Sequence, residues 1–134
     1  MILWIEDDPA TWRYYADILI DDGHHIVFAT NPKDAIDILQ EKHKQIYLII
    51  LDIIMPTVPK PDFLEIPSPI VTGLMIGEYI TQEHPEIPII IFTVINSEEL
   101  RYLNNTVLSI LNKSNPIDLI DTIRGIEEIN KMMA

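Results

Sequence analysis

Acidic residues stand directly after two apolar runs of the sequence. Asp52 follows a run of six apolar residues, and Glu6-Asp7-Asp8 follow an earlier run of four. If these runs form neighbouring parallel strands, their carboxylates meet at the edge where open α/β sheets bind ligands. Carboxylates held close together repel one another, so such a cluster indicates a bound cation or raised pKa values. Oxygen ligands of this kind suit a hard divalent cation.

Two later apolar runs also end in polar residues, Thr93 and Lys113. The Asp52 carboxylate can attack a phosphoryl group and carry it as an acyl phosphate. The Lys113 ammonium can neutralise the phosphoryl oxygens, and the Thr93 hydroxyl can donate a hydrogen bond to them. Asp8 is expected to cap the following helix or to support the metal ligands without touching the ion.

Five short apolar segments are expected to be the strands that position these residues. The segments are residues 2–5, 25–29, 46–51, 87–92 and 107–111. The third lacks polar–apolar alternation, which is typical of a parallel strand buried on both faces.

Helix signals fall between these segments. Pro9 suits a first helical turn, Asn31-Pro32 combines an N-cap residue with a proline at the first helical position, and Asn115-Pro116 repeats that pair. Strand and helix therefore alternate, which predicts a doubly wound parallel sheet with helices on both faces. Residues 57–72 hold four of the ten prolines and are predicted to be a loop.

Composition limits the class of protein. The 134 residues suit one domain, and 48% hydrophobic residues can build a core. The net charge of −12 argues against direct binding to nucleic acid or to anionic membranes. There is no cysteine, and no apolar run approaches the length of a membrane span, so we expect a cytoplasmic protein.

The motifs together resemble one known family, the response-regulator receiver domain of two-component signalling. They are Ile-Glu-Asp-Asp-Pro from position 5, Leu-Asp-Ile-Ile-Met-Pro from position 51, the Ile-Phe-Thr ending at Thr93, and Lys113. The resemblance covers essentially all of residues 1–134. It implies a flavodoxin-like five-stranded sheet of order 2-1-3-4-5.

The resemblance also implies roles for these residues. Asp52 would accept a phosphoryl group from a histidine kinase or phosphotransfer protein. Magnesium would be bound by Glu6, Asp7, Asp52 and the backbone carbonyl of Ile54. Thr93 and Lys113 would contact the phosphoryl group and trigger a switch in contacts with an output protein. Receivers act on themselves, so enzymatic turnover is not expected.

Several positions depart from the family pattern and keep an alternative open. Residues 57–72 replace a short turn, Ile110 stands where the family has a switch aromatic, and Val94 replaces a small residue. The helix expected at residues 96–105 is also short. The altered loop and Ile110 fit a degenerate receiver that binds a partner without phosphorylation.

A phosphatase of the haloacid dehalogenase type is a further alternative, but it usually carries Asp-x-Asp after its first strand. In this chain position 54 is Ile, and Asp52 follows the third predicted strand. The four histidines show no metal-binding spacing, and Trp4 and Trp12 are expected to pack in the core.

Overall fold

The structure is a computed structural model that describes residues 1–55, 69–103 and 106–133. The strands are β1 (Ile2–Ile5), β2 (Ile26–Ala29), β3 (Leu48–Leu51), β4 (Ile89–Thr93) and β5 (Ser109–Asn112). The helices are α1 (Pro9–Asp21), α2 (Pro32–Lys42), α3 (Pro69–Glu83) and α4 (Ile117–Met133), with 3-10 helices η1 (His43–Gln45) and η2 (Ser97–Leu103).

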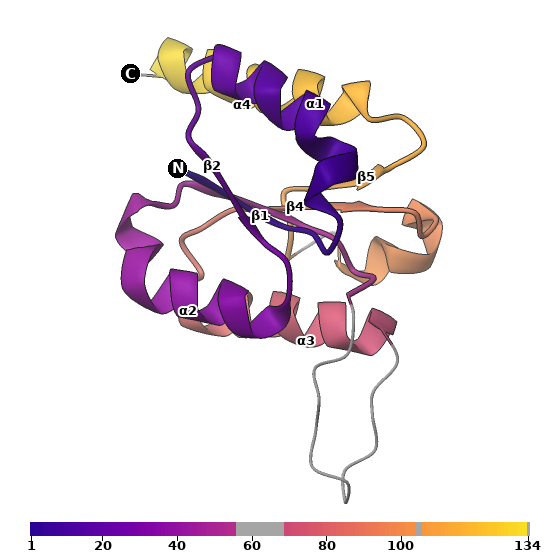
Figure 1. The fold of residues 1–134 in the computed structure, drawn as a ribbon. Coiled ribbons are helices and arrows are strands. Elements are labelled where there is room, and N and C mark those ends of the chain that lie inside the picture. Colours follow the sequence, from indigo (N-terminus) through magenta and orange to yellow (C-terminus); the bar gives the residue numbers. More distant parts are fainter. Residues whose placement is uncertain (56–68, 104–105, 134) are drawn as a thin grey trace, which may run out of the picture.

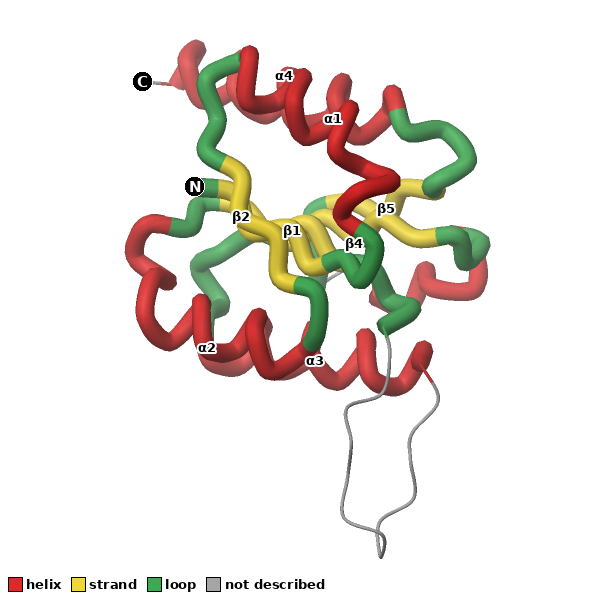
Figure 2. The backbone as a smooth tube through the Cα atoms, in the orientation of Figure 1, coloured by secondary structure: helices red, strands yellow, loops and turns green. Residues whose placement is uncertain are grey.

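All neighbouring strands are parallel, and their order across the sheet is β2-β1-β3-β4-β5. Helices α1 and α4 cover one face, and α2 and α3 cover the other (Figures 1 and 2). The predicted doubly wound sheet, its order and its two helical layers are therefore confirmed.

Strand residues alternate between two apolar cores, one on each face. In β1, Leu3 and Ile5 point to the core shared with α2, α3 and η2, whereas Ile2 and Trp4 point to the core shared with α1 and α4. This follows from the two-residue period of a strand. It also explains the absence of alternation in the sequence, since both faces of the central strands are buried.

Local signals at the helix starts agree with the structure. The Asn31 side chain accepts a hydrogen bond from the backbone N–H of Asp34 at 2.9 Å, and Pro32 opens α2. Such a cap pairs one of the donors that every helix N-terminus leaves free.

The strands predicted at 46–51, 87–92 and 107–111 each begin two residues later in the structure, at Leu48, Ile89 and Ser109. Two further predictions also need correction. The loop predicted over residues 57–72 is wrong at its C-terminal end, because α3 already begins at Pro69; residues 57–68 lie outside the described residues. A proline tolerates the first helical turn, where its missing N–H costs nothing. The segment after β4 forms the 3-10 helix η2 over residues 97–103 in place of a regular α-helix.

Across residues 1–55, 69–103 and 106–133, no helix combines the length and the apolar character needed to cross a bilayer.

Candidate functional site

Strand register brings Glu6 and Asp52 to the same edge of the sheet. Ile5 of β1 pairs with Leu51 of β3. The residue that follows each of them along the chain is acidic, Glu6 in one case and Asp52 in the other. The Asp52 N–H donates to the Ile5 carbonyl at 3.1 Å, which continues the ladder one residue further. Both acidic residues are buried there, with residue Glu6 only 1% and residue Asp52 only 4% exposed.

Asp7 completes a group of three carboxylates with Glu6 and Asp52. One oxygen from each lies within 4.8 Å of the others, while Asp7 itself is exposed to solvent. A set of oxygen ligands that combines two buried groups and one open to water fits Mg²⁺ or Mn²⁺, which retain several waters. The donor chemistry of these residues therefore fits the predicted cation.

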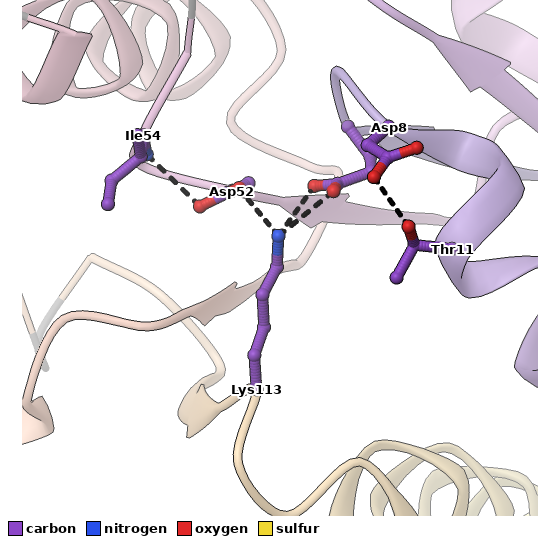
Figure 3. Close-up of polar contacts among 6 residues, drawn as sticks. Asp8, Thr11, Asp52, Ile54 and Lys113 are labelled. Atoms are coloured by element: carbon purple, nitrogen blue, oxygen red, sulfur yellow. Dashed lines mark hydrogen bonds and ion pairs between the residues drawn. The ribbon is translucent and has the colours of Figure 1, made fainter.

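Lys113 follows β5 directly, and its side chain reaches the carboxylate cluster. Its backbone N–H donates to the Thr93 carbonyl at 2.9 Å. Its ammonium donates to Glu6 Oε1 and Oε2 at 2.9 Å each and to Asp52 Oδ2 at 2.7 Å. Figure 3 shows the Lys113 side chain extended toward Asp52. The lysine side chain is only 10% exposed, so these are buried ion pairs.

Burial and neighbouring charge alter the acid–base properties of this group. Burial, and to a smaller degree the Asp52 carboxylate, raise the pKa of Glu6 to about 7, although Lys113 acts in the opposite direction. Burial alone would lower the pKa of Lys113, but its hydrogen bonds to Asp52 and Glu6 outweigh that and raise it. The lysine therefore stays charged, and Glu6 is the group that can exchange a proton near neutral pH.

Thr93 ends β4 beside this cluster, and its hydroxyl is completely buried. Within the described part of the chain, the Thr93 hydroxyl oxygen has no hydrogen-bond partner. Buried hydroxyl groups almost always have a partner in folded proteins. An unpartnered donor at the edge of the sheet is what a phosphoryl oxygen arriving at Asp52 would require.

The peptide N–H of Ile54 is fixed against the Asp52 side chain. Its N–H donates to Asp52 Oδ1 at 3.0 Å, as Figure 3 shows. The two carboxylate oxygens of Asp52 therefore have different partners, with Oδ1 on this N–H and Oδ2 on Lys113. The role of the Ile54 carbonyl as a metal ligand remains a prediction.

Asp8 stands apart from the carboxylate cluster. It occupies the residue before α1, is exposed, and accepts a hydrogen bond from the Thr11 hydroxyl (Figure 3). Its side chain makes no hydrogen bond to a backbone N–H of the helix. The structure thus places Asp8 at a helix start, with a partner on the helix and outside the group of three carboxylates.

Two residues at the site were not predicted from the sequence. The Lys113 ammonium lies 5.1 Å from the centre of the Trp12 ring. Gly73 of α3 approaches the backbone of Ile53 so closely that a Cβ atom there would lie 1.8 Å from the Ile53 carbonyl oxygen. Glycine inside a helical pattern is a general signal of close packing, whereas nothing in the sequence connects Trp12 with Lys113.

A separate groove of about 340 Å³ lies between α3 and η2. Residues of the sheet, α3 and the β4–β5 connection line it, among them Leu51, Ile53, Leu74, Ile91, Tyr102 and Val107. The lining is mainly apolar. None of the carboxylates of Glu6, Asp7 and Asp52 borders the groove, so it is distinct from the acidic site.

The family model of the response regulator receiver domain matches residues 2–124. Among curated protein sequences none matches.

Solved structures of similar fold include a response regulator receiver domain protein from Clostridium thermocellum. It is 20% identical, with a TM-score of 0.74 over 99% of this chain and 98% of that chain. The receiver domain of NtrX from Brucella abortus is 20% identical, with a TM-score of 0.70 over 93% and 95% of the two chains.

A third similar structure is the response regulator TrrA from Thermotoga maritima, solved in complex with Mg²⁺ and BeF. It is 22% identical, with a TM-score of 0.67 over 92% of this chain and 96% of that chain. At these identities the structural likeness shows the fold alone. The family model covers most of the chain, and the chain therefore belongs to the response regulator receiver domain family.

Proposed function

We propose that this protein is a phosphoacceptor receiver in a two-component phosphorelay, a single domain with an insertion after β3. It would take a phosphoryl group onto Asp52 from the phosphohistidine of a histidine kinase or phosphotransfer protein. The observation that carries this proposal is the convergence of three carboxylates, the Lys113 ammonium and the unpartnered Thr93 hydroxyl at one edge of the sheet.

In the transfer, an Asp52 carboxylate oxygen forms a bond to phosphorus while the phosphorus–nitrogen bond to the donor imidazole breaks. The imidazole leaves with the bonding electron pair and takes up a proton. Asp52 Oδ1 already accepts from the Ile54 N–H, so Oδ2, which now accepts from Lys113, is the oxygen we assign as nucleophile. The lysine must move off this oxygen and can then pair with the transferred phosphoryl group.

Glu6, Asp7 and Asp52, with the carbonyl of Ile54, would hold Mg²⁺ or Mn²⁺. When bound, that ion supplies positive charge to the phosphoryl oxygens during transfer. Two side chains of the protein also stabilise the phosphoryl group during transfer: Lys113 provides a second positive charge and Thr93 a hydroxyl donor.

Phosphorylation would then shift an existing conformational equilibrium and change contacts with an output protein. We place this activity in the cytoplasm, with no direct contact to nucleic acid and no membrane attachment. Because the phosphoryl group is received by the protein itself, we propose no enzymatic turnover on a separate substrate.

Intact mass after incubation with acetyl phosphate tests the proposal. We expect a gain of one phosphoryl group that requires Mg²⁺ and is absent in Asp52→Asn. Thr93→Ala and Lys113→Met are expected to slow or weaken the reaction without moving its site. An adduct that persists in Asp52→Asn would refute the assignment of Asp52, and a Mg²⁺-independent adduct would refute the proposed role of the cation.

A second candidate function is phosphorylation-independent partner binding. The groove between α3 and η2 favours it, since its mainly apolar surface could receive an apolar segment of a partner. The half-buried Ile110 also stands where the family pattern has an aromatic switch residue. No mass gain, together with no change in the amide spectrum on adding beryllofluoride and Mg²⁺, would favour this function.

A further inference from the structure

Trp12 lies against Lys113, the cation that pairs with Glu6 and Asp52 at the acidic site. Its ring centre is 5.1 Å from the Lys113 ammonium, within the distance at which an aromatic face attracts a cation. The lysine side chain is 10% exposed, and burial strengthens such an attraction. The contact joins α1 with the residue that follows β5, two elements far apart in the sequence.

The Trp12 ring is itself held in place. It packs edge-on against Phe92 with centroids 5.0 Å apart, and Tyr15 lies 5.8 Å away on the same helix. Phe92 is fully buried in β4 and directly precedes Thr93. The Trp12 ring beside Lys113 is therefore packed against β4, the strand that carries the Thr93 hydroxyl.

The carboxylates and the indole hold Lys113 in different ways. Glu6 and Asp52 hold it by charge, and that attraction falls when another cation or a phosphoryl group engages those carboxylates. The indole is neutral, and its attraction for the ammonium does not depend on the state of the carboxylates. When the ion pairs open, the Trp12 face remains as a contact at the edge of the sheet.

We propose that Trp12 is a positioning residue that keeps the Lys113 ammonium at the phosphoryl site when its ion pairs with Glu6 and Asp52 are broken. This inference rests on the proposed function, because it assigns Trp12 a part in phosphorylation of Asp52. Trp12 acts through the lysine and has no contact of its own with the reacting atoms.

The contact is tested first in the metal-free protein. The Lys113 side-chain methylene protons nearest the ammonium should show an upfield ring-current shift by NMR. That shift should disappear in Trp12→Leu, remain in part in Trp12→Phe, and stay unchanged in Tyr14→Leu, the control that removes an exposed aromatic ring of the same helix. Ordinary lysine chemical shifts in the wild type would overturn the proposal.

The positioning role is tested by initial rates of phosphorylation with acetyl phosphate and Mg²⁺. Trp12→Leu should react about fivefold more slowly than the wild type, the factor expected from a cation–π contact of ordinary strength. Trp12→Phe should recover most of that loss, because it restores an aromatic face.

Trp12→Leu and Trp12→Phe are then repeated in a Lys113→Met background. This comparison distinguishes an effect on the position of the lysine from a general loss of structure. If Trp12 acts through the ammonium, Trp12→Leu should cause no further loss once the ammonium is gone. An equal loss in both backgrounds, or an unchanged rate in Trp12→Leu alone, would overturn the proposal. A wild type that gains no phosphoryl group would instead refute the proposed function, while the ring-current shift would still report where the lysine is held.

Discussion

Replacing Lys113 with methionine removes the only described cation that pairs with Glu6 and Asp52, while keeping a side chain of similar length. Three hydrogen bonds of 2.9, 2.9 and 2.7 Å are lost. The two carboxylates stay buried, with side chains 1% and 6% exposed, and face one another without a countercharge. Breaking one side of a buried ion pair costs about 3–5 kcal/mol of unfolding free energy.

The size of this loss should depend on pH through Glu6. Its pKa of about 7 means that the carboxylate is ionised at high pH and largely protonated well below neutrality. Above pH 8 we expect Lys113→Met to lose about 3 kcal/mol or more. Near pH 6 Glu6 is largely protonated, so the substitution removes only the ion pair of Lys113 with Asp52. For that charged hydrogen bond we expect a loss of about 2 kcal/mol of unfolding free energy.

Urea unfolding followed by circular dichroism measures both values. Lys33→Met is the matched control: it removes a pair with Asp37 of 2.8 Å whose side chains are 76% and 56% exposed, and should cost less than about 0.5 kcal/mol. Adding Mg²⁺ at about 100 times its Kd should raise the free energy of unfolding of Lys113→Met by about 2.7 kcal/mol. A loss below about 1 kcal/mol above pH 8, or the same loss at both pH values, would refute the reasoning.

Three further predictions concern stability measured by the same urea unfolding. Because folding raises the pKa of Glu6 from 4.5 to about 7, the wild type should be most stable below pH 4.5 with respect to this group and lose that contribution as pH rises through 7; Glu6→Gln should remove this part of the pH dependence. Gly73→Ala should cost about 1–3 kcal/mol because its Cβ would meet the Ile53 carbonyl, whereas Gly125→Ala, with nothing within 4 Å, should gain up to about 1 kcal/mol from helix propensity. Asn31→Ala should cost about 1 kcal/mol by removing the α2 cap; a neutral result there would show that solvent replaces the cap.

The sequence by itself determined the elements and the residues that end them. Unbroken apolar runs predicted strands buried on both faces, and the pair Asn31-Pro32 predicted a helix start that the structure contains. These patterns depend on residues close together in the chain, so they can be read without knowing the fold. The positions of Glu6, Asp52 and Lys113 at strand ends belong to the same class of local information.

Only the tertiary structure decided how those residues meet. Lys113 pairs with Glu6 across 107 residues and with Asp52 across 61, and the register of β1 with β3 sets that geometry. The contact of Trp12 with the ammonium has the same origin, since α1 and the end of β5 become neighbours only through the folded sheet.

Steric limits between distant segments were likewise decided by the fold. The prolines of residues 57–72 indicated a loop through local rules, but α3 begins at Pro69 and brings Gly73 against the Ile53 backbone. Local propensity describes what each segment favours in isolation. Register, close approach and buried charge arise between segments, and these decide which side chains can act together at Asp52.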